Sequence, residues 1–139
     1  QTDITHLADR PVTELSGGEL QRLTVARALA QQTPIIMLDE PTSFLDINHQ
    51  LSVLRLLRRL RDAGKTVLCV SHDLNLTATF FEHVAMLRAG EIVATGPPSQ
   101  IITTDLIRDV YGAEVQVDQT PAGNPRVTMT AAEPAGDPE

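Results

Sequence analysis

The stretch that decides the fold reads LSGGELQRLTVARALAQQTPIIMLDEP and covers residues 15–41. It begins with a glycine-containing helix start, continues through an apolar helical segment, and ends in a short apolar strand followed by two carboxylates. Free N–H groups at the start of a helix attract anions. Open α/β sheets bind their ligands at the carboxyl ends of the strands. The stretch therefore predicts one part of a phosphate-binding site.

The helix start has two interpretations. Ser16 and Glu19 have the S-x-x-E spacing of a capping box, which on its own would indicate only a well-capped helix. Gly17 and Gly18 favour the second interpretation, because glycine in the first turn costs stability and is useful where something must approach the backbone closely. We therefore expect an anion site at the start of a helix over residues 19–32, whose apolar positions indicate that it is largely buried.

Two carboxylates, Asp39 and Glu40, directly follow the apolar run at residues 35–38, which is typical of a central parallel strand. One carboxylate can hold Mg²⁺, usually through water, and the other can orient or deprotonate an attacking water. The alternative interpretation is a solvated turn before the following proline. His72 follows the next apolar run, at residues 66–70, and lies at the same sheet edge if the two strands are neighbours.

The rest of the chain continues the alternation of strands and helices. Asp46 is the expected N-cap of a helix over residues 47–62, whose arginines lie mainly on a solvated face. Asp73 caps a third helix. Further expected elements are strands at 84–87 and 91–95, two short helices between 98 and 111, and a terminal hairpin at 114–118 and 126–130, followed by a disordered tail from 131. This order predicts an α/β fold with a parallel sheet flanked by helices and a small C-terminal β-hairpin.

Length, charge and composition exclude some classes of protein. The chain has 139 residues, enough for one domain with a core, and a net charge of −7 without a basic stripe, which argues against a nucleic-acid binder. The single cysteine, Cys69, lies in an apolar run and is expected to be buried, in a reducing compartment. No stretch approaches the roughly 18 apolar residues of a membrane-spanning helix. The chain starts at Gln1, so we expect an artificial boundary, a processed end or a truncated reading frame.

Four motifs, in this order, resemble those of ABC-type ATPase subunits. They are the ABC signature at residues 15–22, the Walker B strand with its following glutamate at 35–40, the D-loop at 43–46 and the switch-histidine strand at 70–73. The resemblance covers residues 10–112 and implies the C-terminal half of a P-loop NTPase domain. A G-x-x-x-x-G-K-[ST] loop, an adenine-stacking aromatic residue and a glutamine loop belong to the N-terminal half of such subunits and are absent from this sequence.

The resemblance implies a role for each residue at the strand ends. Asp39 would support Mg²⁺. Glu40 would act as the general base or orient the attacking water, and His72 would contact the γ-phosphate of ATP. In this interpretation Glu40 and His72 are the catalytic pair.

The helix start would serve a different ATP. Ser16, Gly17 and Gly18 would touch the γ-phosphate of an ATP that the opposite subunit of a head-to-tail dimer holds. Glu19 and Asp46 complete the nucleotide-binding set, and Asp46 would also communicate across the dimer interface. Each signature would thus serve a site to which its own chain contributes nothing else.

Three segments, at residues 41–50, 71–75 and 88–96, are similar to ATPase subunits of importers for iron–siderophore complexes, haem or cobalamin; importers of amino acids or metal ions have a similar layout. The resemblance implies a second ATPase subunit and membrane permease subunits as partners, and no nucleic acid. It also implies a peripheral location on the cytoplasmic face of the bacterial inner membrane.

The motifs also suggest a division of the chain. Residues 1–33 would end a helical subdomain that carries the signature, residues 34–112 would form the second half of the ATPase core, and residues 113–139 would form the hairpin and an acidic, disordered tail.

Three interpretations of function stay open. The first is a fragment of the ATP-hydrolysing subunit of an importer, and the second is a fragment of a soluble ABC-type ATPase that acts in translation or DNA repair. The third is a truncated, non-enzymatic interaction module. Because the P-loop lysine and backbone supply most of the grip on the phosphates, we expect the chain alone neither to bind ATP tightly nor to hydrolyse it. We also expect exposed apolar surface to make it poorly soluble or oligomeric.

Overall fold

A computed structural model describes residues 4–130 of the chain, so the tail predicted from residue 131 lies outside the described residues. The chain divides into two compact units, Gln1–His72 and Asp73–Glu139. The three-part division made from the motifs stays a prediction. Within the described range, no helix is both long enough and apolar enough to cross a membrane.

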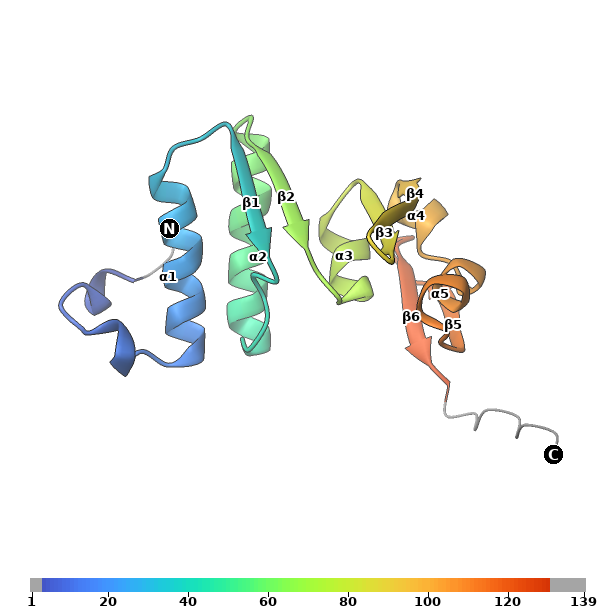
Figure 1. Ribbon diagram of the computed structural model, residues 1–139, viewed down its shortest axis with the longest axis horizontal. Helices are drawn as coiled ribbons and strands as arrows, with labels where there is room; N and C mark the ends of the chain where they lie inside the picture. Colours follow the sequence, from blue (N-terminus) through green and yellow to red (C-terminus); the bar gives the residue numbers. More distant parts are fainter. Residues whose placement is uncertain (1–3, 131–139) are drawn as a thin grey trace. The chain divides into compact units, whose positions relative to one another are not determined.

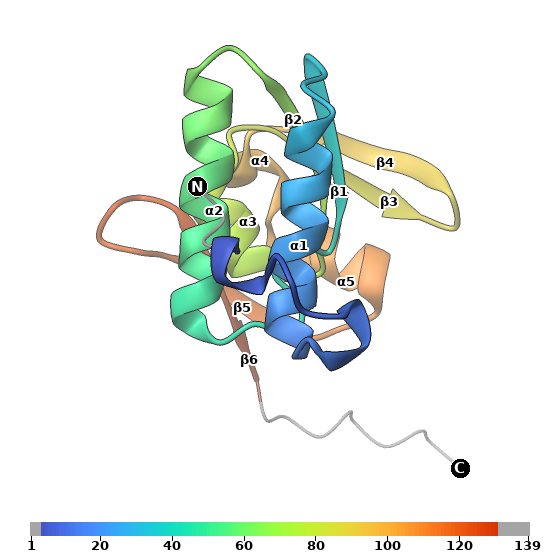
Figure 2. The same cartoon turned by 90° about the vertical axis from the view of Figure 1, so that its left-hand side faces the viewer.

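The first unit is built around a strand–helix–strand motif (Figure 1). Its elements are the 3-10 turns η1 (Thr5–Leu7) and η2 (Val12–Glu14), helix α1 (Gly17–Ala30), strand β1 (Ile35–Asp39), helix α2 (Ile47–Asp62) and strand β2 (Thr66–Val70). The two strands pair in parallel, with Asp39 opposite Val70, and α2 forms the crossover between them. Helix α1 contacts both β1 and α2, as Figure 2 shows. The predicted α/β character with parallel strands is confirmed.

Helix α2 has a buried apolar face and an exposed face that carries arginines. Val53, Leu54, Leu56 and Leu57 are buried, whereas the arginines at 55, 58 and 59 are exposed, as the sequence predicted. Burial of an apolar stripe is the main source of stability for a helix of this kind. The helix therefore lies against the sheet with its leucine-rich face inward.

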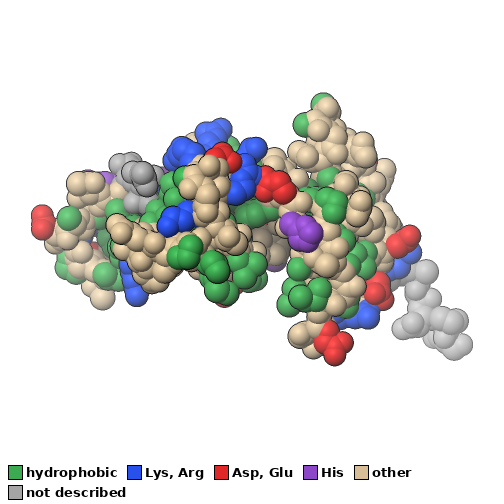
Figure 3. Space-filling view, turned by 90° about the horizontal axis from the view of Figure 1, so that it is seen from above, with side chains coloured by type: hydrophobic (Ala, Val, Ile, Leu, Met, Phe, Trp, Pro, Cys, Tyr) green, Lys and Arg blue, Asp and Glu red, His purple; other side chains and the backbone are tan. Residues whose placement is uncertain are grey.

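The sheet is covered on one face only. Ile36 and Leu38 of β1 are buried, but Ile35 and Met37 are 55% and 69% exposed, and Leu68 and Val70 of β2 are also exposed. The apolar run at residues 35–38 predicts a central parallel strand, but β1 is one of two paired strands, and within the described residues only one of its faces is covered. Figure 3 shows hydrophobic side chains at several places on the surface as seen from above.

Two further burial predictions depend on the same packing. The sequence predicts that helix α1 is largely buried, but Val25 is its one buried residue, and among the strands and helices α1 packs mainly against β1 and α2. Cys69 is half-buried rather than buried. Its partial burial, with a smaller effect of the charge on Asp39, raises the pKa of the thiol to about 11. The thiol is therefore protonated and unreactive at neutral pH.

The second unit contains two antiparallel hairpins and three short helices (Figure 1). Its elements are α3 (Leu74–Phe80), β3 (Val84–Arg88), β4 (Glu91–Gly96), α4 (Pro98–Ile101), α5 (Thr104–Tyr111), β5 (Val115–Gln119) and β6 (Pro125–Met129). Both hairpins and the pair α4 and α5 are confirmed predictions. Ala78, Ile102 and Ile107 form the core of this unit, and valines of β5 and β6 pack against it.

Candidate functional site

The turn after β1 holds the first candidate carboxylate in an unusual backbone conformation. Glu40 has a φ of +44°, in the left-handed region that residues with a Cβ rarely adopt. Its N–H donates to the carbonyl of Val70 at 3.0 Å, and its own carbonyl accepts from the N–H of Ser43 at 3.1 Å. The same carbonyl accepts from Nε2 of Gln21 at 2.9 Å. The backbone of Glu40 is thus fixed by β2, by its own turn and by α1.

The side chain of Glu40 is held as firmly as its backbone. Oε1 lies 2.8 Å from Nδ1 of His72, and Oε2 accepts from the hydroxyl of Ser43 at 2.8 Å. The Ser43 bond first, and the His72 bond second, hold the pKa of Glu40 below its usual value, so the carboxylate is ionised at neutral pH. The His72 side chain is 75% exposed, which leaves its ring accessible from solvent.

The meeting of Glu40 and His72 follows from the strand order. The sequence placed His72 near Glu40 only on the condition that β1 and β2 are neighbours, and their parallel pairing meets that condition. Asp39 ends β1 opposite Val70 and is exposed. The structure therefore brings all three sequence-predicted side chains to the carboxyl end of the sheet, where ligands bind in α/β folds.

Asp39 could serve a metal only as one ligand among several. No cluster of three or more His, Cys, Asp or Glu side chains suited to a metal ion occurs in the part of the chain that the structure describes. Mg²⁺ in nucleotide sites commonly takes one or two carboxylates and fills its octahedron with waters and phosphate oxygens. An exposed carboxylate at a strand end fits that role, and it does not fit a site made of protein ligands alone.

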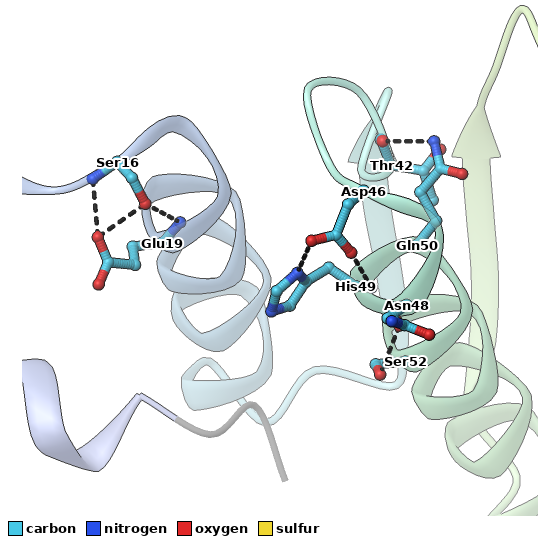
Figure 4. A network of polar contacts seen from close by, with 8 residues as sticks. All are labelled: Ser16, Glu19, Thr42, Asp46, Asn48, His49, Gln50 and Ser52. Atoms are coloured by element: carbon cyan, nitrogen blue, oxygen red, sulfur yellow. Dashed lines mark hydrogen bonds and ion pairs between the residues drawn. The ribbon is translucent and has the colours of Figure 1, made fainter.

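The start of α1 is a complete capping box (Figure 4). The Ser16 hydroxyl accepts from the N–H of Glu19 at 3.3 Å and donates to Oε2 of Glu19 at 2.7 Å, and the N–H of Ser16 donates to the same oxygen at 2.8 Å. The two bonds that reach the Glu19 carboxylate, from the Ser16 N–H first and from its hydroxyl second, lower the pKa of Glu19. The predicted capping box is confirmed, and it engages the side chains of both residues.

The two glycines of this helix start lie against the loop that follows the carboxylates. A Cβ at Gly17 would be 3.8 Å from Cβ of Phe44, and one at Gly18 would be 3.4 Å from Cδ2 of Leu45. Both distances are ordinary van der Waals contacts, so packing within this unit does not require glycine at either position. The N–H groups of the first helical turn have no acceptor within a helix. Both facts are compatible with the expected anion site, which stays a prediction.

Asp46 is the N-cap of α2, as predicted. Its Oδ1 accepts from the N–H of His49 at 2.9 Å, and its Oδ2 lies 2.8 Å from Nδ1 of the His49 ring (Figure 4). These two contacts, the backbone one first, lower the pKa of Asp46. Phe44, two residues earlier, has a φ of +63° and is 93% exposed.

Two residues that shape this site had no role assigned to them from the sequence. Gln21 and Ser43 lie inside the motifs at residues 15–22 and 43–46, but side-chain bonds to Glu40 have no sequence pattern of their own. Position within a motif was the only available signal.

Comparison with known proteins agrees with this geometry. A sequence profile described as "ABC transporter" matches residues 1–43. The ferric enterobactin transport ATP-binding protein FepC of Escherichia coli is 48% identical over 91% of this chain and 47% of its own length. The chain is homologous to the ATP-binding proteins of ABC transporters.

Other relatives of this chain carry related names. The hemin import ATP-binding protein HmuV of Streptomyces coelicolor is 47% identical over 84% of the chain and 42% of its own length. The iron(3+)-hydroxamate import ATP-binding protein FhuC of Bacillus subtilis is 39% identical over 94% and 49%. The chain thus spans about half the length of the curated relatives it matches.

Solved structures lead to the same family. A metal-chelate type ABC transporter in an inward-facing conformation matches with a TM-score of 0.77 and 30% identity, over 91% of this chain and 52% of that one. The dimeric ABC transporter cassette MJ0796 matches with a TM-score of 0.63 and 38% identity, over 68% and 40%. The fold of this chain is therefore part of an ABC ATPase domain.

Proposed function

We propose that this chain supplies one half of the ATP-hydrolysing subunit of an ABC importer for an iron–siderophore complex, haem or cobalamin. The observation that carries the proposal is the 2.8 Å contact between Glu40 and His72 at the carboxyl ends of two parallel strands. The names of three relatives, which concern ferric enterobactin, hemin and iron(3+)-hydroxamate, support the class of cargo.

The proposed chemistry is attack of water on the γ-phosphate of ATP. Glu40, an ionised carboxylate whose pKa Ser43 and His72 lower, orients the water and accepts its proton. His72 holds the Glu40 carboxylate through Nδ1, so its other ring nitrogen is the one that contacts a phosphate oxygen. Asp39 would hold Mg²⁺, which supplies positive charge to the phosphates when it is bound.

The proposed assembly is a head-to-tail pair of ATPase subunits beneath a permease. In it, Ser16, Gly17, Gly18 and Glu19 face the ATP of the opposite subunit, and Asp46 lies at the interface. The exposed, left-handed loop before Asp46 and the dimeric state named for the MJ0796 cassette support this arrangement. The subunit is peripheral, on the cytoplasmic face of the bacterial inner membrane, and binds no nucleic acid.

A chimera tests the proposal. The 128 residues of FepC that match this chain are replaced by the corresponding residues of the chain, and Mg-ATP hydrolysis of the purified protein is measured. We expect hydrolysis, and a loss of about 10²- to 10⁴-fold in kcat for Glu40→Gln, the range for removal of a general base. Glu91→Gln, at the exposed start of β4, is the matched control and leaves kcat unchanged.

Two results would contradict the proposal. A folded chimera that hydrolyses no ATP would show that the chain is not half of such a subunit. A Glu40→Gln chimera as active as the unchanged one would remove Glu40 from the reaction.

A further inference from the structure

One hydrogen bond joins α1 to the carboxylate turn. Nε2 of Gln21 donates to the carbonyl of Glu40 at 2.9 Å, across 19 residues of sequence and in a partly buried position. The bond connects the element that begins with the glycine-containing start to the residue that follows β1. This hydrogen bond therefore connects two motifs that lie apart in the sequence.

Glu40 needs such a link because its backbone is unfavourable. A φ of +44° is costly for a residue with a Cβ, and such conformations persist only where the surroundings impose them. Two of the bonds that impose it here come from backbone groups, the carbonyl of Val70 and the N–H of Ser43. The third comes from the Gln21 side chain, so it is the one of the three bonds that a substitution of the partner residue can remove.

The direction of the Glu40 side chain depends on this backbone. From the left-handed position its two carboxylate oxygens reach His72 and Ser43, each at 2.8 Å. We infer that Gln21 is a positioning residue: by holding the Glu40 carbonyl, it keeps the carboxylate against His72 and Ser43 and couples the start of α1 to that carboxylate.

The inference has a consequence for regulation, and this part rests on the proposed function. Gly17 and Gln21 are four residues apart on one helix, so they lie on the same face. Gly18 lies against Leu45, in the loop that follows Glu40. The start of α1 would face the ATP of the opposite subunit, whereas Glu40 would act on the ATP of its own. Gln21 would therefore let nucleotide at one site adjust the carboxylate of the other.

The positioning role is tested on the chain itself, without ATP. Carbon-13 NMR of the side-chain carboxylates gives the pKa of Glu40 in the unchanged chain and in Gln21→Met, which removes the donor at similar volume. We expect the pKa to rise toward the usual value of 4.5, because the Ser43 and His72 bonds lengthen. Gln31→Met, at the exposed C-terminal end of the same helix, is the control and leaves it unchanged.

A merely structural Gln21 would give a different result. It would lower the unfolding temperature of Gln21→Met without moving the pKa of Glu40, and that outcome would overturn the inference. If Gln21→Met does not fold, Gln21→Asn takes its place, because its amide is one carbon too short to keep the 2.9 Å bond. The same rise in the pKa of Glu40 is then expected, and no rise contradicts the inference.

The FepC chimera tests whether this positioning matters for hydrolysis. Because small displacements of a positioned group cost much of its effect, we expect Gln21→Met to lower kcat about ten- to hundredfold and leave KM for Mg-ATP within about twofold. An unchanged kcat would show that the positioning has no effect on hydrolysis and would refute the coupling, while the proposed function stands. An inactive unchanged chimera would refute the proposed function, and the NMR measurement would still decide the role of Gln21.

Discussion

Replacing Ser16 by alanine tests whether the start of α1 is held by its cap in the way the structure describes. The substitution removes the hydroxyl that accepts from the N–H of Glu19 at 3.3 Å and donates to its carboxylate at 2.7 Å. It leaves the bond from the backbone N–H of Ser16 to Glu19, at 2.8 Å, in place. Half of the capping box therefore survives.

The expected loss of stability follows from the part of the capping box that remains. Loss of an N-cap side chain costs about 0.5–2 kcal/mol, and because the site is exposed and half of the box stays, we expect about 0.5–1 kcal/mol for Ser16→Ala. Urea unfolding, followed by a probe in the first unit, measures it. Ser52→Ala is the matched control: its hydroxyl donates to the carbonyl of Asn48 within α2, where alanine is the better helix former, so no loss is expected.

The pH dependence gives a second, independent check. The pKa of Glu19 is lowered in the folded chain, so this carboxylate stabilises the fold above the usual value of 4.5, and the contribution is lost as the pH falls through the lower, folded value. Ser16→Ala removes one of the two bonds that lower it. The difference in stability between the two proteins should therefore shrink in acid. A variant as stable as the unchanged chain, or a difference that persists unchanged in acid, would refute the reasoning.

Three further predictions address the pKa of Glu40, the core of the second unit and the exposed face of β1. Ser43→Ala should raise the pKa of Glu40, because the Ser43 hydroxyl is the largest cause of its lowering, while Ser43→Thr keeps the hydroxyl and the low value; carboxylate NMR distinguishes them. Ile107→Ala should destabilise the second unit by about 2–5 kcal/mol, and the exposed Met129→Ala should not, as urea unfolding will show. Met37→Asp should reduce self-association in light scattering, since Met37 is 69% exposed on an apolar face; unchanged association would exclude that face as its cause.

Much of the fold was predictable because its signals are local. The capping box, the Asp46 cap and the β3–β4 hairpin each depend on a few neighbouring residues; the turn of that hairpin has positive φ at Ala89 and Gly90, as tight two-residue turns require. Burial was not predictable in the same way. The apolar run of β1 indicates that its side chains favour an interior, but it does not say which face has a covering element, and Ile35 and Met37 are exposed.

The contact between Glu40 and His72 shows why part of the site could not be predicted from the sequence. The alternation along β1 puts Asp39 on the exposed face and would put the next residue, Glu40, on the face toward the core if the strand continued. The alternation along β2 continues through Val70 to His72 on its exposed face. An extended Glu40 would therefore point away from His72 and bury a charge, which is costly. The left-handed turn at Glu40 breaks the alternation at that residue, and this single conformational change allows the carboxylate to meet the imidazole.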